Sequence, residues 1–245
     1  MPLSIICLLF SFLLLPVVKA GKNEATAVTA VASINTANST VNNNSSLEAA
    51  GLKIYDSLKL DNLGLSQEAM LYAFKGHQLL ANRGQLENDA ILTVVDFSQP
   101  SSKKRMYIID VKNFKVLMNT YVAHGKNSGL QFAEKFSNKI ESLQSSLGFY
   151  VTKETYFGKH GLSLRLSGKD RGFNDNAEKR AVVIHGAQYI GESRADAAFM
   201  GRSFGCPAVP QAQSSKVINI IKNGTCLFVY HPSKTYLQKS TILNA

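Results

Sequence analysis

The sequence has few cysteines and none of the close spacings that metal sites use. Three cysteines and five histidines occur in 245 residues, and they form no Cys-x-x-Cys or His-x-x-Glu-His pattern. Structural and catalytic zinc sites depend on such closely spaced ligands. We therefore predict no metal and no cofactor.

Acidic residues are also scarce. The chain has 17 Asp and Glu against 27 Lys and Arg, which gives a formal net charge of +10. A basic surface suits nucleic acid, anionic lipid or an anionic cell wall. Because zinc-finger spacings, recognition-helix signatures and RNA-binding motifs are lacking, we predict no nucleic-acid partner. The densest basic run, Lys103-Lys104-Arg105, lies between two predicted strands, and we interpret it as a solvated loop.

The apolar run at residues 8–18 is too short for a membrane span. Small residues follow at Val18 and Ala20, in the positions that a signal peptidase reads. We expect residues 1–20 to be a cleaved secretion signal, with an uncleaved anchor as the alternative, and no stable membrane span after cleavage. Residues 21–46 are rich in Ala, Asn, Ser and Thr and lack large apolar side chains, so they predict a flexible linker.

Residues 47–84 have apolar residues at helical spacing and predict a small helical segment. Its second helix should begin at Ser66 as the N-cap and end at Gly84. We expect His77 on this helix to be a residue at the edge of the core, not a ligand. The predicted inward face consists of Met70, Ala73, Phe74, His77 and Leu80.

From residue 90 onwards, short apolar runs separated by glycine and polar residues predict strands. A short late helix should start at Ser214 or Ser215, with Val217, Ile220 and Ile221 turned inward. We predict a mostly β (α+β) domain over residues 90–232, sandwich-like or barrel-like, followed by a C-terminal tail at 233–245. The predicted strands cover residues 91–97, 106–110, 116–123, 148–155, 162–166, 181–185 and 225–230.

Cys206 and His185 form the most informative pair in the sequence. A strand ends at His185, and Cys206 follows a glycine in a later loop, so the two side chains can meet in one cleft. A thiol becomes a strong nucleophile when an imidazole takes or holds its proton. Cys226 lies in a buried apolar strand, so we expect Cys206 to be free and not in a disulfide.

This pair predicts acyl transfer. Cys206 would attack an amide carbonyl to form a thioester, and His185 would protonate the leaving amine. The backbone N–H groups of Gly205 and Cys206 could stabilise the oxyanion, whereas Pro207 has no N–H. Ser203 is either a turn residue or a group that orients His185. If the pair is ionic, alkylation of Cys206 should stay fast below the ordinary thiol pKa of about 8.5. The alternative is that Cys206 only fills a loop.

Ser203-x-Gly205-Cys206 with the upstream His185-Gly186 resembles the Ser-His-Gly-Cys signature of the L,D-transpeptidase catalytic domain family, and of its murein branch most closely. Phe204 replaces the usual histidine of that signature, and Pro207-Ala208 replaces the usual Ile-Arg. The resemblance covers roughly residues 90–232. Further similar segments are residues 123–129, 136–138, 145–150 and 158–161.

The resemblance implies a mixed β fold and peptidoglycan stem peptides as substrates. The donor carbonyl would belong to the third stem residue, the terminal D-Ala would leave, and an amine of a neighbouring stem would accept the acyl group. Water in place of that amine would give L,D-carboxypeptidase activity. The resemblance also implies that a carbapenem acylates the nucleophile, and that the protein is exported to a bacterial periplasm or cell envelope.

Three residues are candidates for substrate binding. His124 closes a predicted strand and could line the cleft, or could simply bond to a backbone carbonyl. Arg202 could anchor a substrate carboxylate through two hydrogen bonds, and Gly186 follows the predicted catalytic histidine. Asn174 and Arg180 give weaker signals. Two other functions remain open: a cysteine peptidase or amidase of different specificity, and a non-catalytic module that binds the cell wall.

Overall fold

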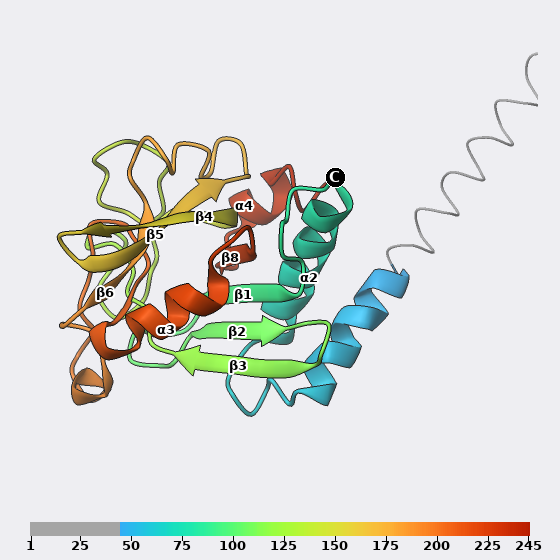
Figure 1. Cartoon of the computed structure of the whole chain (residues 1–245), viewed down its shortest axis with the longest axis horizontal. Helices are drawn as coiled ribbons and strands as arrows, with labels where there is room; N and C mark the ends of the chain where they lie inside the picture. The colour runs from blue at the N-terminus through green and yellow to red at the C-terminus, as the bar shows by residue number, and fades with distance from the viewer. Residues whose placement is uncertain (1–44) are drawn as a thin grey trace, which may run out of the picture. The chain divides into compact units, whose positions relative to one another are not determined.

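The computed structural model describes residues 45–245, which form one compact unit (Figure 1). The predicted secretion signal and nearly all of the predicted linker lie outside the described residues. A first helix covers residues 45–57, and α2 follows at Gln67–Asn82. No helix within residues 45–245 combines the length and the apolar character that a membrane crossing needs.

Helix α2 forms as its sequence predicts. The hydroxyl of Ser66 accepts a hydrogen bond from the Ala69 N–H at 3.2 Å, which satisfies one of the free donors at the helix start. Gly84 adopts a positive φ of 65° just beyond the helix end. The predicted inward face is confirmed, because all five of its residues are buried. At Gly76 an added Cβ would lie 2.1 Å from the Phe149 ring, so a side chain there would push α2 off the sheet.

The strands form a single mixed sheet of eight strands in the order β3-β2-β1-β8-β4-β5-β6-β7. β1 pairs with β8 and β6 with β7 in parallel, and the other neighbours are antiparallel. The strands are β1 Ile91–Asp96, β2 Met106–Asp110, β3 Lys115–Thr120, β4 Gly148–Gly158, β5 Gly161–Gly168, β6 Val183–Ala187, β7 Ala208–Pro210 and β8 Cys226–Tyr230.

The two ends of the sheet nearly meet. The chain beyond β3 forms a bridge from Ala123 to Ala208 of β7, with the Ala123 N–H 2.8 Å from the Ala208 carbonyl oxygen. This near-closure confirms the predicted mostly β, barrel-like class. It also brings the loop after Ala123 next to the segment that carries Cys206.

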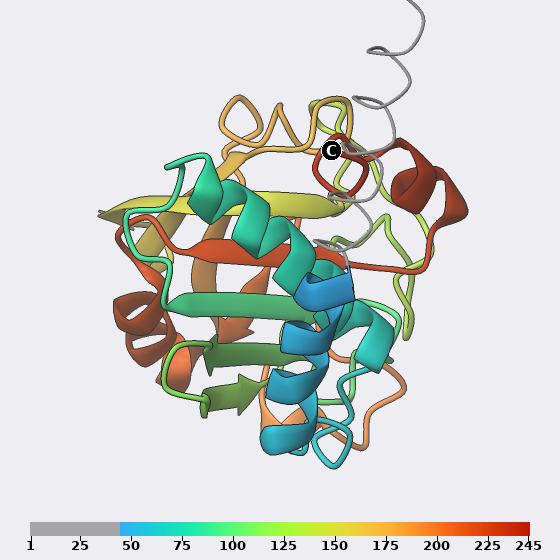
Figure 2. The same ribbon diagram turned by 90° about the vertical axis from the view of Figure 1, so that its right-hand side faces the viewer.

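Helices pack against the sheet and bury its faces. α2 contacts β1 and β8, and Figure 2 shows it crossing these strands. α3, Gln211–Ile221, contacts β5, β6 and β7. The prediction that α3 starts at Ser214 or Ser215 is wrong, because Pro210 takes the N-cap position and the helix starts directly after it. Val217 and Ile221 are buried as predicted, but Ile218 is the third fully buried residue and Ile220 is only partly buried.

Residues 233–245, which we expected to be a tail, contain helix α4, Lys234–Lys239. Its Tyr236 is fully buried, and the phenol donates to the Asp170 carboxylate at 3.0 Å. The hydroxyl of Ser240 donates to the other oxygen of the same carboxylate. The backbone N–H of Phe149 at the start of β4 is a further donor, at 2.9 Å. Asp170 therefore joins the C-terminal segment to the sheet.

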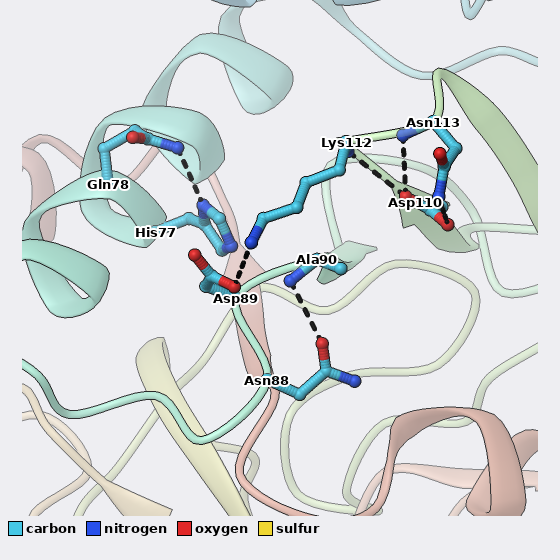
Figure 3. A network of polar contacts seen from close by, with 8 residues as sticks. All are labelled: His77, Gln78, Asn88, Asp89, Ala90, Asp110, Lys112 and Asn113. Atoms are coloured by element: carbon cyan, nitrogen blue, oxygen red, sulfur yellow. Dashed lines mark hydrogen bonds and ion pairs between the residues drawn. The ribbon is translucent and has the colours of Figure 1, made fainter.

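His77 is a buried histidine at the edge of the core, as predicted (Figure 3). Gln78 contacts its Nδ1 at 3.2 Å, whereas its Nε2 has no hydrogen-bond partner within residues 45–245. Figure 3 shows the ring beside the ion pair between Asp89 and Lys112. Burial lowers the pKa of His77 to about 4, and the nearby Lys112 lowers it further, although contacts with Asp89 act in the opposite direction.

Candidate active site

His185 lies in the middle of strand β6, opposite Ser163 of β5 and Ala208 of β7, and its side chain is almost fully buried. Its Nδ1 is 2.9 Å from the Gly186 carbonyl oxygen. Because a carbonyl can only accept, Nδ1 carries the proton, and Nε2 of the neutral ring is left as a base. Burial lowers the pKa of His185, the hydrogen bond to Gly186 acts in the opposite direction, and the electrostatic effects of His160 and Lys159 lower it further.

Cys206 lies in a tight turn just before β7. The hydroxyl of Ser203 accepts from the Gly205 N–H at 3.1 Å and donates to the Cys206 carbonyl at 2.6 Å. Gly205 has a φ of 123°, a conformation that only glycine adopts without strain. Ser203 is therefore a turn residue here, and His185 receives its orientation from Gly186 instead.

The turn changes one detail of the predicted oxyanion site. The Gly205 N–H, which we predicted to be a donor to the oxyanion, donates to Ser203 in this structure. The Cys206 N–H remains as the other predicted donor. For Gly205 to contribute as well, its bond to Ser203 would have to open during the reaction.

The surroundings of Cys206 favour the neutral thiol. Its sulfur donates to the Ala181 carbonyl at 3.7 Å. Burial raises the pKa of Cys206, although the Val183 N–H and the charges of Arg180 and Lys159 lower it in part. Since the pKa of His185 is lowered, both groups favour their neutral forms. These directions favour a neutral pair, in which His185 takes the proton as the sulfur attacks, over the ion pair considered from the sequence.

Arg180 contacts the loop that packs against the turn at residues 203–206. The sequence gives only a weak signal for this role. Its guanidinium donates to the Ser137 carbonyl at 2.7 Å, to the Gln144 carbonyl at 2.6 Å and to the hydroxyls of Ser142 and Ser146. A Cβ added at Gly205 would lie 3.3 Å from its Nη2. Arg180 thus holds the loop at residues 137–146 against the turn and places a positive charge near the thiol.

Replacing Arg180 should slow acyl transfer and make the thiol less acidic. We expect Arg180→Ala to lower the rate by roughly 10- to 100-fold, because both the charge and the loop contacts are lost. Arg180→Lys keeps the charge but loses the planar fork, so it should retain the pH dependence and recover only part of the rate. The rate of alkylation by iodoacetamide as a function of pH measures the thiol pKa directly. Arg171→Ala, an exposed arginine of the same segment, is the control. Identical alkylation profiles for Arg180→Ala and the wild type would contradict this role.

Two other residues predicted to bind substrate, Arg202 and Gly186, make contacts within the protein. Arg202 donates to the carbonyls of Lys126 at 2.8 Å and Gly129 at 3.2 Å, so its Nη1 is occupied. An added Cβ at Gly186 would lie 2.7 Å from side-chain atoms of Gln211 and Ser214, so glycine allows α3 to approach β6. The contacts of Arg202 and Gly186 thus stabilise the fold around the site. Direct substrate binding by either residue stays a prediction.

His124 is fully buried, and both of its ring nitrogens have hydrogen-bond partners. One partner is a backbone carbonyl, which agrees with the alternative to a role in lining the cleft. Arg105 donates to its Nδ1 at 2.8 Å, which requires that Nε2 carry the proton, and Nε2 lies 3.3 Å from the Gly129 carbonyl. The interpretation of Arg105 as a solvated residue is wrong. Its guanidinium is fully buried over the Phe97 ring and donates to the Val122 carbonyl, whereas Lys103 and Lys104 are exposed.

The two buried histidines should make the fold sensitive to acid. Burial lowers the pKa of His77 and of His124 from 6.5 to about 4, and Arg105 adds to the effect at His124. Between these values the unfolded chain binds protons that the folded chain does not, so stability falls as the pH drops from about 6.5 towards 4. Each residue should account for about 2–3 kcal/mol of that loss. Urea unfolding at several pH values tests this, and His77→Gln should flatten the dependence. An unchanged dependence in that variant would contradict the assignment.

Comparison with known proteins establishes the family. Residues 61–230, about two-thirds of the chain, match the model of the L,D-transpeptidase catalytic domain. The chain therefore belongs to the L,D-transpeptidase catalytic domain family. The match confirms the resemblance predicted from the residues around Cys206 and His185. No protein with a curated description matches the sequence.

Several solved structures are similar to this one at low identity. An L,D-transpeptidase from Mycobacterium smegmatis shares 12% identity at a TM-score of 0.37, over 58% of this chain and 59% of its own. The helical cell shape determining protein Pgp2 from Campylobacter jejuni shares 14% at 0.39, over 65% and 57%. An L,D-transpeptidase from Stackebrandtia nassauensis shares 14% at 0.33, over 68% of both chains. The chain spans less than two-thirds of the length of the first two. At these scores the family assignment rests on the family match.

Proposed function

We propose that this protein is a peptidoglycan L,D-transpeptidase that forms a cysteine thioester with its donor stem peptide. The observation that carries the proposal is the pairing of β6 with β7. It sets His185, with Nε2 free to accept a proton, beside the turn that presents Cys206. Membership of the family supports the same chemistry, and the net charge of +10 suits an anionic cell wall.

The reaction would proceed through two acyl transfers. Nε2 of His185 takes the thiol proton as the Cys206 sulfur attacks the carbonyl carbon of the third stem residue. The C–N bond breaks, and His185 gives the proton to the departing amine. An amine of a second stem then attacks the thioester and passes a proton to His185. The C–S bond breaks, and His185 returns that proton to the departing sulfur, which restores the thiol. Water in place of the amine would give L,D-carboxypeptidase activity from the same intermediate.

The proposal places the protein outside the cytoplasm, where peptidoglycan is assembled. This proposed location depends on the predicted secretion signal at residues 1–20 and on the substrate class. A non-catalytic wall-binding module has less support. Binding alone requires neither a cysteine presented on a tight glycine turn nor a buried histidine whose Nε2 can accept a proton.

The decisive assay offers a donor tetrapeptide stem together with an isotope-labelled D-amino acid. The account expects the labelled amine in the product, with free D-Ala released in equal amount. Strict hydrolysis would favour the carboxypeptidase or another cysteine amidase. Loss of both products in His185→Gln, with the fold intact by circular dichroism, would place the chemistry at this pair. Turnover that persists in His185→Gln would contradict the assigned base.

A further inference from the structure

The tip of the β4–β5 hairpin carries two basic residues that the mechanism above does not use. Residues 158–161 read Gly-Lys-His-Gly, and Gly161 adopts a φ of 76° that closes the turn. Lys159 and His160 are both exposed. The hairpin runs beside β6, and the His160 ring stacks on the ring of His185 with centroids 4.3 Å apart and an interplanar angle of 24°. The hairpin tip therefore forms a wall of the catalytic centre.

A cavity of about 450 Å³ opens beside this stack. Three parts of the fold meet there: the hairpin tip, the end of β6 with the residues that follow it, and the first residue of α3. The cavity contains basic and neutral groups but no acidic side chain. Its lining residues are Lys159, His160, Gly161, Gly186, Ala187, Gln188, Tyr189 and Gln211.

Lys159 is the free cation of this cavity. Within residues 45–245 it takes part in no ion pair. A second cavity of about 330 Å³, lined by Ala181 to Val183 near the thiol, contains both Glu154 and Glu178 as well as two basic residues. Of these two cavities, the one at the hairpin tip offers an uncompensated positive charge next to the candidate catalytic histidine. The charge of Lys159 also reaches both reacting groups, since it lowers the pKa of His185 and of Cys206.

The position of the cavity decides which part of the substrate it can hold. His185 must give its proton to the departing amine, so the departing residue lies on the His185 side of the sulfur. In an α-amino acid the carboxylate is attached to the carbon that bears the amine. The carboxylate of the departing residue would therefore lie close to a cation that is beside His185.

We propose that this cavity binds the free α-carboxylate of the terminal residue of the donor stem, with Lys159 as the anchoring cation and His160 as the positioning residue that fixes the His185 ring. The proposal rests on the proposed function. As the C–N bond breaks, the amine takes the proton from His185, and the amino acid leaves with its carboxylate still paired to Lys159. In the reverse sense, the same cavity would hold an incoming D-amino acid during exchange.

Binding to a variant that cannot react tests the site without turnover. We would measure the affinity of Cys206→Ala for a tetrapeptide stem and for the same peptide with a C-terminal carboxamide. The free acid should bind about tenfold more tightly, because only it forms a charge-assisted bond. Adding Lys159→Gln should remove that preference and leave the affinity for the carboxamide unchanged. Lys179→Gln is the control, an exposed lysine that lines neither of the two cavities.

Equal affinity for the free acid and the carboxamide would overturn the proposal. A preference for the free acid that survives Lys159→Gln would also overturn it, and so would a failure of both peptides to bind. The proposed function is tested separately, by turnover of the wild type on the free acid. A wild type that turns over neither peptide would refute the function whatever the binding data show. His160→Ala should lower kcat and raise the pKa on the acid side of the pH profile, since the effect by which His160 lowers the pKa of His185 is removed. A lower kcat with an unchanged profile would reduce His160 to a structural residue.

Discussion

Cys206→Ala is expected to abolish acyl transfer, lowering kcat/KM by at least about a thousandfold, because the thioester cannot form without the sulfur. The fold should survive, since the side chain is only partly buried and its sulfur makes one weak bond, to Ala181. Labelled D-amino acid incorporation measures the loss, and a thermal melt verifies the fold.

Cys226→Ala is the matched control for this prediction. Cys226 is fully buried in β8, and burial raises the pKa of its thiol beyond the range where a thiolate forms. Its replacement should retain activity and cost about 1 kcal/mol of stability through a small cavity. Activity that survives in Cys206→Ala but disappears in Cys226→Ala would contradict the assignment of the nucleophile.

Asp170→Ala is expected to lower the free energy of unfolding by about 3–5 kcal/mol. The carboxylate is fully buried, forms no ion pair within residues 45–245, and depends on the donors Phe149, Tyr236 and Ser240. Truncation would leave these three donors buried without a partner. Urea unfolding measures the loss, and hydrogen exchange should show that α4 opens first.

Asp175→Ala separates this effect from a general loss of charge in the same loop. Asp175 is exposed and accepts from the Gly172 N–H and the Asn138 amide, so its removal should cost less than about 1 kcal/mol. Equal losses in the two variants would contradict the special role of Asp170. So would an Asp170→Ala protein whose C-terminal helix stays protected.

The elements that could be predicted from the sequence are those whose signal is local. The face of α2 follows from helical spacing and from Ser66 at its cap, and most strands follow from their apolar runs. No local pattern predicts β7, because it has only three residues and ends in Pro210, and its pairing with β6 depends on tertiary structure. The same proline moved the start of α3 away from Ser214.

The site divides in the same way. Cys206, His185 and Gly205 belong to motifs that a single sequence displays. The burial of Arg105 and the contacts of Arg180 depend on chain segments about 15 to 45 residues away, which no local pattern records. The charge state of Cys206 and His185 depends on burial, so the sequence leaves open whether the pair is ionic or neutral, whereas burial in the fold shifts both pKa values towards the neutral forms.

The central claim, that Cys206 is an acyl acceptor, is tested most directly by intact mass. A carbapenem carries a strained amide that acylates a competent nucleophile and remains attached. The account predicts one adduct of the carbapenem's mass on the wild type and on Cys226→Ala, and none on Cys206→Ala. An unmodified wild type, or an adduct that persists in Cys206→Ala, would contradict it.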